Sequence, residues 1–434
     1  MENRYEQYKD SGIAWIGEIP EHWEIRKLKN IFLLSTGTTP KEYEKISEGD
    51  NLINWYTPSD ILEGSNDLFG SQRKLSEKVI YENKISLFPI GTLLYVGIGA
   101  SAGKVGYANE YGYSNQQITG LIPLECYSKF YFYYLSVLKD KIRDNAFFTT
   151  LPIINNVYLG QELIPYPLLS EQQSIATYLD QKCSEIDELI TLQEEMITKL
   201  QSYKQSVITE AVTKGLDKNV PLKDSGIEWI GEIPEHWKIS KIKSHYNVIL
   251  GKMVEKNNDS STSGENYLCA ANIKWNGVDT EINKKMYFSD IEKEKYLLQY
   301  NDVLIMEGGM AGTTCLYKNQ FSPCYVQNSV NVCRAKKDFN NKFLYYWMYV
   351  PYYNGYIDTI CNKATIKHYT KEKVQNTPIL VPLISEQQSI ADYLDQKCSE
   401  IDALISIKQQ KIEKLKDYKK SLIFECVTGK RKVS

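Results

Sequence analysis

Glycine-rich turns hold the first residues of this sequence whose types and spacing could do chemistry. Residues 97–102 read GIGASA after an apolar run and fit the G-x-G-x-x-A fingerprint of dinucleotide-binding folds. That fingerprint opens a helix and needs an acidic residue about 20 positions further on. Here Gly103 and Gly106 interrupt any such helix, and no acidic residue stands near that distance. We therefore predict a tight turn that exposes backbone N–H groups, to which a phosphate could bind.

A second nucleotide-binding pattern is also incomplete. Gly103 and Lys104 resemble the end of a P-loop, but five residues rather than four separate Gly97 from Gly103. Val105 occupies the position where a P-loop needs a Ser or Thr that binds Mg²⁺. The sequence therefore predicts neither of these two nucleotide sites.

Transferase and nuclease chemistry lack their residues as well. There is no Pro-Pro dipeptide, which amino-methyltransferases carry in their catalytic loop. The carboxylate–lysine pairs at residues 24–27 and 292–295 have a spacing found in nucleases, but no convincing metal-binding aspartate on a strand precedes either pair. His22 and His236 lie inside a repeated element, where we expect a packing or capping role. We predict no catalytic residue and no metal site in this chain.

Cysteine usage agrees with that prediction. The chain has nine cysteines, an odd number, and no C-x-x-C pair. A zinc ribbon or finger needs closely paired thiolates to complete its tetrahedron. We expect the cysteines to be reduced and to pack as small hydrophobic residues.

Length and composition are those of an ordinary soluble protein. The 434 residues suffice for two or three domains, and 42% hydrophobic with 24% charged residues is typical. No apolar run approaches the roughly 18 residues that suggest a membrane-spanning helix. The opening MENRYE has no apolar core of a signal peptide. We expect a cytoplasmic protein without a membrane partner.

The charge is unevenly distributed along the chain. A formal net charge of −3 argues mildly against a nucleic-acid partner. Residues 24–168 hold 14 basic and 15 acidic residues, a net of −1, while residues 238–383 hold 19 and 13, a net of +6. All other residues hold 18 and 26, a net of −8. The acidity lies outside these two segments, which leaves a nucleic-acid partner open.

An internal repeat determines the architecture. Residues 9–29 and 223–243 are identical at 17 of 21 positions, and residues 170–187 and 385–402 are identical at 17 of 18. The chain is therefore two tandem halves. Between these elements, each half holds strand-like runs, a glycine-rich turn and a short aromatic helix, but the two sequences diverge. Each variable part, at residues 30–165 and 244–380, predicts an α+β domain.

A long amphipathic helix is predicted after each domain, at residues 170–214 and 385–428. Steps of four and three residues reach ten positions in each helix; eight are apolar, and the polar exceptions fall at the same two places. Such a seam is typical of a coiled coil, in which matched polar residues can fix the register. Each helix would reach about 60 Å at 1.5 Å per residue, so we expect an antiparallel pair that acts as a spacer. The predicted core positions are Leu179, Cys183, Ile186, Ile190, Ile197, Leu200 and Val207, and Leu394, Cys398, Ile401, Ile405, Ile412, Leu415 and Leu422.

Three features together resemble the specificity subunits of Type I restriction–modification systems. They are the tandem half-repeat, the SGI-x-WIGEIPEHW openings at residues 11–23 and 225–237, and the SEQQSIA-x-YLDQK helix starts. The resemblance covers essentially the whole chain. It implies an α+β fold with two target recognition domains, separated by two long spacer helices, each domain binding half of a bipartite DNA site. The implied division is 1–168 and 216–383 for the opening elements with their recognition domains, and 169–215 and 384–434 for the spacer helices.

The same resemblance implies partners and their cofactors. In the family, the spacer regions bind two methyltransferase subunits, which hold S-adenosylmethionine. Restriction subunits that use ATP and Mg²⁺ complete the complex. On this interpretation the chain is a non-catalytic DNA-binding subunit and holds no cofactor itself. Two alternatives remain open: a specificity subunit of a methylation-only or phage-exclusion system, and a two-headed adaptor whose aromatic-rich heads bind protein or glycan.

Candidate DNA contacts follow from side-chain chemistry. Arg pairs with guanine, Asn or Gln pairs with adenine, and Lys neutralises phosphates. An A+T-rich genome would account for the same abundance of Lys, Asn and Tyr. The candidates are Arg73, Lys74, Lys104, Asn115 and Gln116 in the first domain, and Asn272, Lys274, Gln327, Asn328, Lys363, Lys367 and His368 in the second.

Overall fold

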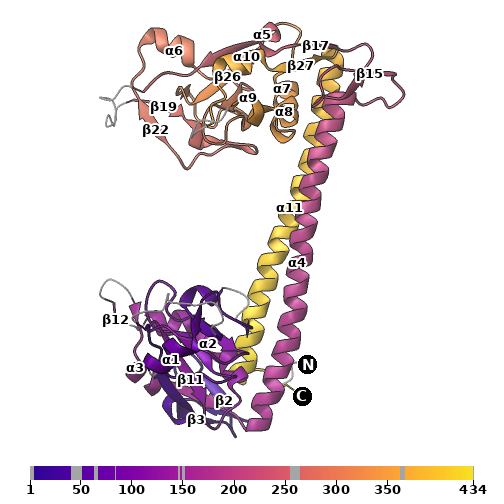
Figure 1. Cartoon of the computed structure of the whole chain (residues 1–434). Helices are drawn as coiled ribbons and strands as arrows, with labels where there is room; N and C mark the ends of the chain where they lie inside the picture. Colours follow the sequence, from indigo (N-terminus) through magenta and orange to yellow (C-terminus); the bar gives the residue numbers. More distant parts are fainter. Residues whose placement is uncertain are drawn as a thin grey trace. The chain divides into compact units, whose positions relative to one another are not determined.

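The chain forms two compact units of the same build. The computed structural model describes residues 4–40, 51–62, 67–83, 85–144, 147–148, 152–254, 264–361 and 367–433. Unit 1 comprises Met1–Gln193 and Gln410–Ser434, and unit 2 comprises Glu194–Gln409. Each unit contains one globular head and part of each of two long helices, α4 (Leu169–Lys214) and α11 (Ile384–Val427) (Figure 1).

The head of unit 1 (head 1) is built around a five-stranded sheet of order β4-β11-β8-β9-β6. Its central strand β8 (Leu93–Val96) is buried along its whole length, since all four side chains are apolar or aromatic. A three-stranded sheet, β10-β5-β7, and the pair β14-β3 complete the head, and the hairpin β1-β2 precedes it. The other strands are β1 (Tyr8–Asp10), β2 (Glu18–Pro20), β3 (Glu24–Lys27), β4 (Phe32–Thr36), β5 (Leu52–Tyr56), β6 (Asp67–Leu68), β7 (Lys74–Ser76), β9 (Val105–Ala108), β10 (Tyr113–Ser114), β11 (Ile118–Pro123), β12 (Phe147–Phe148), β13 (Pro152–Ile153) and β14 (Leu163–Tyr166). The helices are α1 (Glu77–Asn83), α2 (Ser128–Asp144) and α3 (Asn156–Gln161).

The head of unit 2 (head 2) repeats this plan with one strand fewer in the main sheet. Its sheets have the orders β18-β26-β23-β24, β22-β19-β25, β17-β27 and β20-β21, and the hairpin β15-β16 precedes them. The strands are β15 (Leu222–Asp224), β16 (Glu232–Pro234), β17 (Lys238–Lys241), β18 (Tyr246–Leu250), β19 (Glu265–Leu268), β20 (Ile273–Lys274), β21 (Gly277–Val278), β22 (Lys284–Met286), β23 (Val303–Met306), β24 (Thr314–Leu316), β25 (Tyr325–Val326), β26 (Val330–Ala335) and β27 (Pro378–Val381). The helices are α5 (Ile242–His245), α6 (Asp290–Tyr296), α7 (Asn341–Trp347), α8 (Tyr349–Tyr353), α9 (Tyr356–Ile360) and α10 (Lys371–Asn376).

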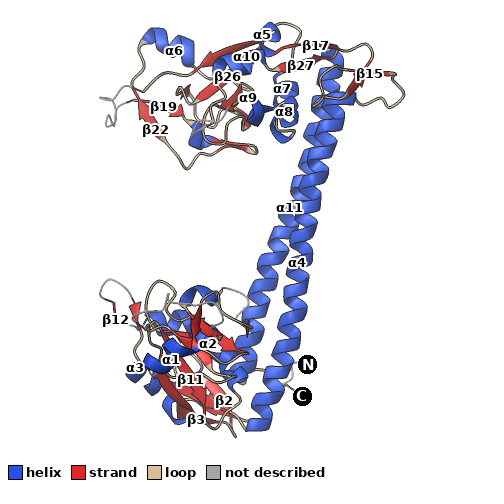
Figure 2. Cartoon of the chain, viewed as in Figure 1, coloured by secondary structure: helices blue, strands red, loops and turns tan. Residues whose placement is uncertain are grey.

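The main sheets of the two heads share the order of four strands, β4-β11-β8-β9 and β18-β26-β23-β24, although the sequences differ. In each head, the first and last strands pair antiparallel and close the domain at its base: β3 with β14, and β17 with β27. In each, one short strand, β10 or β25, joins its small sheet in parallel. Figure 2 shows the mixture of strands and short helices in both heads and the purely helical character of α4 and α11.

The long helices pair antiparallel in each unit, as the heptad pattern predicts. In unit 1, Lys419 Nζ lies 2.7 Å from Asp187 Oδ2, and in unit 2, Lys204 Nζ lies 2.7 Å from Asp402 Oδ2. Both lysines are polar exceptions of the seam, and their side chains are only 19% and 21% exposed. Their aspartate partners are 49% and 55% exposed, so water still screens both pairs, and pairs of this kind contribute at most about 1 kcal/mol.

The predicted seam positions face inward. Leu179, Cys183 and Ile186 are buried with Leu422 in one cluster of unit 1, and Val207 is buried with Leu394 and Cys398 in one cluster of unit 2. No predicted core position is exposed. The remaining ones are Ile401 and Ile412, which are buried, and Ile190, Ile197, Leu200, Ile405 and Leu415, which are partly buried.

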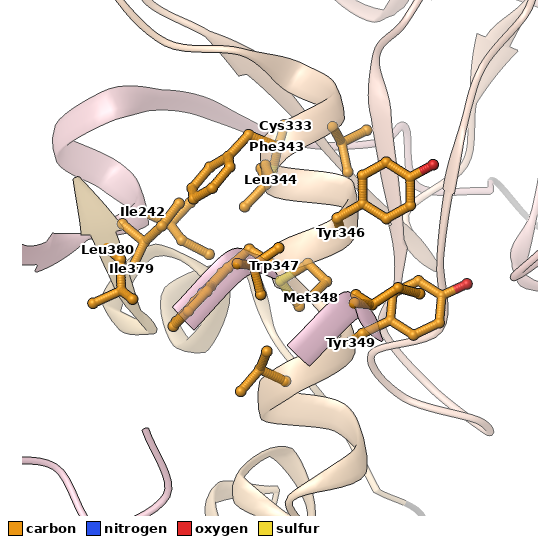
Figure 3. Close-up of a cluster of buried hydrophobic side chains, with 14 of the residues drawn as sticks. Ile242, Cys333, Phe343, Leu344, Tyr346, Trp347, Met348, Tyr349, Ile379 and Leu380 are labelled. Atoms are coloured by element: carbon orange, nitrogen blue, oxygen red, sulfur yellow. The ribbon is translucent and has the colours of Figure 1, made fainter. Parts of the chain in front are cut away.

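The hydrophobic cores join each head to its helices. In unit 1, Trp23 of the first repeated element is fully buried with Phe130 of α2 and with residues of both long helices. Figure 3 shows part of the corresponding core of unit 2, where α7 supplies Phe343, Leu344 and Trp347. Trp347 Nε1 donates to the Pro378 carbonyl oxygen at 3.0 Å, which ties α7 to the closing strand β27.

The structure confirms the predicted fold class: two α+β heads and two long paired helices. Ser170 and Ser385 lie inside the first helical turn, because the helices begin at Leu169 and Ile384. At α11, Glu386 accepts the N–H of Leu383 at 2.9 Å and takes over part of the capping. Among the described residues, no helix is long and apolar enough to cross a membrane.

Candidate nucleic-acid interface

The glycine-rich turn of head 1 is a hairpin turn and not a nucleotide motif. It joins β8 directly to the antiparallel strand β9, so the helix that both nucleotide fingerprints require is absent from this place. Gly103 donates its N–H to the Val96 carbonyl oxygen at 2.9 Å. Its φ of +91° lies in the region that favours glycine. The prediction of a tight turn is confirmed.

Three loops meet around this turn in head 1. Gly97 N–H donates to the carbonyl oxygen of Gln117, and Ile154 N–H donates to that of Gly97, both at 2.8 Å. These bonds join residues 97–104 to residues 115–117 and 152–154. We call this set of loops the three-loop surface of head 1.

Head 2 has an equivalent three-loop surface, made of residues 307–313, 327–329 and 367–369. Glu307 N–H donates to the Ser329 carbonyl oxygen at 2.9 Å, and Tyr369 N–H donates to that of Glu307 at 2.7 Å. The same pair of backbone bonds thus holds the same three loops in both heads. The side chains on the loops differ between the two heads.

Seven of the predicted DNA contacts belong to these surfaces. In head 1, Gln116 is exposed and Lys104 partly exposed, while Asn115 is nearly buried and its side-chain amide donates to Gln117 Oε1 at 3.0 Å. Asn115 therefore shapes the turn that presents Gln116. In head 2 the members are Gln327 and Asn328, both partly exposed, and Lys367 and His368, both exposed.

Three more predicted contacts are exposed outside the three-loop surfaces. Arg73 lies just before strand β7 and Lys74 is its first residue, at the edge of the small sheet of head 1. Lys274 lies on β20 of head 2. Arg26 and Arg334 form ion pairs with Glu24 and Asp302, as Lys367 does with Asp358.

The prediction for Asn272 is wrong. Its side chain is fully buried, and its amide donates to the carbonyl oxygens of Asp279 and Ile282, both at 2.8 Å. Its Oδ1 accepts the N–H of Cys269 at 3.0 Å. Asn272 therefore ties the turn before β20 to the loop after β21 and has no group free for a base. Lys363 lies outside the described residues.

The sequence analysis missed Lys284 and Lys285 on β22, both of which are exposed. Lys285 pairs with Asn266 of β19, and Lys74 pairs with Asn54 of β5. Each asparagine directly precedes the residue that pairs with the parallel strand, so Lys285 and Lys74 hold equivalent places in equivalent sheets. Alignment of the two halves by strand order, rather than by residue identity, would have found them. Contact of any of these side chains with DNA remains a prediction.

The repeated elements form connectors between the parts of each unit. Glu171 Oε2 lies 3.0 Å from His22 Nε2, and the equivalent Glu386 Oε1 lies 2.9 Å from His236 Nε2. These bonds join the start of each long helix to the repeated PEHW element. The histidines therefore have the packing role that the sequence predicts.

A buried glutamine makes a second connection. Gln172 Oε1 accepts the N–H of Tyr127 at 2.8 Å, just before α2. Gln387 Oε1 accepts the N–H of Asn340 at 3.0 Å, just before α7. Both glutamines are fully buried, which makes such satisfied hydrogen bonds necessary. The near-identity of the SEQQ repeats thus reflects the same contacts made twice.

The described residues contain no group of three or more His, Cys, Asp or Glu side chains that could hold a metal ion. Burial raises the pKa of the Cys183 and Cys398 thiols to about 11, so both stay protonated and unreactive near neutral pH. What the heads offer is a pair of loop surfaces with Lys, Gln, Asn and Arg side chains.

The comparison with known families decides what these heads are. The sequence profile described as "Type I restriction modification DNA specificity domain" matches residues 20–201 and again residues 234–417. The chain belongs to this family. It is a specificity subunit of a type I restriction–modification system, with two DNA specificity domains.

Relatives and solved structures agree with this assignment. The chain is 27% identical, over 439 residues and 96% of each chain, to a putative type I restriction enzyme MjaX specificity subunit of Methanocaldococcus jannaschii. A chain from a structure described as "Structural basis underlying complex assembly and conformational transition of the type I R-M system" matches with a TM-score of 0.74 and 15% identity, over 94% of this chain and 98% of that one. The HsdS subunit from Thermoanaerobacter tengcongensis matches with a TM-score of 0.55 and 15% identity, over 95% and 98%. At 15% identity, the similarity to both structures supports the fold alone.

Proposed function

We propose that each head of this specificity subunit reads one half of a bipartite DNA site and that the chain does no chemistry itself. The observation that carries the proposal is the pair of equivalent three-loop surfaces with different side chains. Phosphate contacts position a protein on DNA, and contacts with base edges give specificity. Gln116 and Lys104 in head 1 and Asn328, Lys367 and His368 in head 2 supply both kinds of group.

We also propose that the subunit directs two methyltransferase subunits, which hold S-adenosylmethionine, and restriction subunits that use ATP and Mg²⁺. The number two is supported by matched exposed apolar residues on the long helices. Leu189 and Leu192 of α4 are 43% and 44% exposed, and Leu404 and Ile407 of α11, each 215 positions later, are 48% and 60% exposed. Two equal apolar surfaces fit two copies of one partner.

These surfaces fit a helix of the partner. Residues three apart lie on one face of a helix, so each pair presents one apolar stripe. An amphipathic helix lays its own apolar face on such a stripe. We therefore assign Leu189 with Leu192, and Leu404 with Ile407, to the docking of one methyltransferase subunit each.

A test of this docking uses charge on one stripe only. The variant L404D/I407D is expected to bind one methyltransferase subunit instead of two, because a carboxylate buried against an apolar helix costs several kcal/mol. Native mass spectrometry of the co-purified complex gives the count. The control S406D/Q409D adds the same charge at neighbouring exposed positions of α11 and should still bind two. Equal loss of partner in both variants would contradict the assignment.

The proposed function itself predicts a clear dependence on partners. Purified alone, the chain is expected to methylate and cleave no DNA, with or without S-adenosylmethionine, ATP and Mg²⁺. Co-purified with its methyltransferase, it is expected to bind DNA and to methylate a single bipartite motif, read by sequencing. Catalysis by the isolated chain would contradict the non-catalytic role. A complex that binds protein or glycan but no DNA would favour the adaptor alternative.

A further inference from the structure

One aromatic helix keeps three residues of its sequence between the two otherwise divergent heads. Residues 129–135 of α2 read KFYFYYL, and residues 342–348, in and just after α7, read KFLYYWM. The lysine, the phenylalanine and the tyrosine four residues after the lysine stand at the same places. Core packing explains the aromatic residues, but it does not require a lysine or a tyrosine hydroxyl. In each unit, the lysine ammonium group and the tyrosine hydroxyl contact the same aspartate of a long helix.

In unit 2 that partner is Asp395 of α11. Lys342 Nζ lies 2.6 Å from Asp395 Oδ2, and the Tyr346 hydroxyl donates to Asp395 Oδ1 at 2.7 Å. Lys342 and Tyr346 stand one helical turn apart, so they reach the same carboxylate from one face of α7. Tyr346 is 4% exposed. Burial and its bond to Asp395 raise the pKa of Tyr346, so the hydroxyl remains a donor.

In unit 1 the equivalent partner is Asp180 of α4. The Tyr133 hydroxyl donates to Asp180 Oδ1 at 2.6 Å, and Lys129 Nζ lies 3.7 Å from the same oxygen. Lys129 also binds Asp67 of β6, and its side chain is only 9% exposed. Head 1 therefore repeats the tyrosine hydrogen bond to the helix aspartate, while its lysine makes a longer ion pair with that aspartate and bonds a carboxylate of its own head, Asp67.

The two aspartates come from the repeated sequence YLDQK, 215 positions apart. One heptad after each of them stands another aspartate, Asp187 or Asp402, which binds a lysine of the other long helix. Each connector thus carries two carboxylates on one side of its helix, the first for the head and the second for the opposite helix.

We propose that this Lys–Tyr–Asp contact is the positioning device that sets the angle of each head on its long helix. Hydrophobic packing is not directional, so it holds the head without fixing its rotation. In unit 2, two charge-assisted hydrogen bonds to the two oxygens of Asp395 fix direction as well as distance. In unit 1, the hydrogen bond from Tyr133 to Asp180 and the longer ion pair with Lys129 act from the same face of α2. The contact recurs in two heads whose sequences otherwise differ. It is therefore also the shared contact through which different heads attach to the same connector.

The test rests on the proposed reading of a bipartite site and measures the gap between half-sites. Unit 2 is the better place for it, because Lys342 forms its ion pair with Asp395 without a further carboxylate such as Asp67. The variants D395N and Y346F keep the size of each side chain. In both, the loosened head should accept sites whose gap is one base pair longer or shorter. Methylation at these gaps, relative to the cognate gap, is expected to rise by about tenfold, the order allowed by loss of one hydrogen bond to a charged group.

Two further variants separate positioning from stability. The exchange K342D/D395K reverses the ion pair and should restore most of the selectivity for the cognate gap. The control E400Q neutralises a carboxylate on the same helix whose partner, Lys397 at 3.0 Å, is three residues away, and its gap selectivity should equal that of the wild type. The ratio of non-cognate to cognate methylation is measured within one sample, so it does not depend on the amount of folded protein.

The outcomes are distinguishable from failure of the proposed function. A wild-type complex that methylates no bipartite site would contradict that function. A wild-type complex that does so, while D395N and Y346F lose methylation evenly at all gaps, would overturn the positioning role alone. Broadened gap selectivity in E400Q as well would also overturn it, because Glu400 does not contact the head in the described structure.

Discussion

Removal of residues 190–196 from α4 together with residues 405–411 from α11 is expected to shorten the unread gap of the DNA site by about three base pairs. Seven residues of helix span about 10 Å at 1.5 Å per residue. One base pair of B-DNA rises about 3.4 Å. A deletion of one heptad keeps the apolar seam in phase, so the helices still pair. Sequencing of methylated sites measures the gap directly.

The interhelical ion pairs explain why both helices must be shortened. Residue numbers 187 and 419 add to 606, and so do 204 and 402, so one antiparallel register satisfies both pairs. Removal of residues 190–196 alone leaves 10 positions from Asp187 to Lys204 but 17 from Asp402 to Lys419. Only one pair can then form. We expect this single-helix deletion to lose assembly or methylation, whereas the matched deletion retains both.

Two results would decide against a spacer that acts as a ruler. The first is a matched deletion that stays folded and active with an unchanged gap and unchanged half-sites. The second is a single-helix deletion that behaves like the matched one. As a further control, loss of two residues from α4 rotates the following seam by about 200° and should abolish assembly.

The long helices could be predicted from the sequence almost to the residue. The predicted ranges 170–214 and 385–428 compare with Leu169–Lys214 and Ile384–Val427 in the structure. The heptad period is a local property of the sequence, so it can be recognised without knowledge of the tertiary fold. Even the polar exceptions Lys204 and Lys419 were informative, since both lie in interhelical ion pairs.

Residues whose role depends on irregular loops could not be predicted in the same way. Asn272 has the right chemistry for adenine, but its partners are carbonyl oxygens 7 and 10 residues ahead, in a loop without periodicity. Lys284 and Lys285 became visible only when β22 was matched to β7 by sheet order. Asp180 and Asp395 stand in an obvious repeat, but their partners are fixed by the packing of α2 and α7 against the long helices.

Exchange of one head is expected to change one half of the recognised DNA site and to leave the other half unchanged. The structure places the best junctions for this exchange after β3 and before β14, so that both closing strands stay with the host protein. Lys27 pairs with Leu163 and Glu24 pairs with Tyr166, so a cut within β14 would combine half of this ladder from one protein with half from another. Residues 28–162 should therefore be exchanged as one piece. In head 2, the equivalent piece between β17 and β27 is residues 242–377.

The incoming head must also supply the groups that meet its connector. A donor with lysine and tyrosine at the positions of Lys129 and Tyr133 should give a complex as active as the parent, because Asp180 then keeps both partners. A donor that lacks them should bind the new half-site but tolerate altered gaps. Sequencing of methylated sites reports half-sites and gap together, and the reciprocal exchange of residues 242–377 must change the opposite half-site. Altered specificity in both halves after either exchange would mean that the heads are not independent readers.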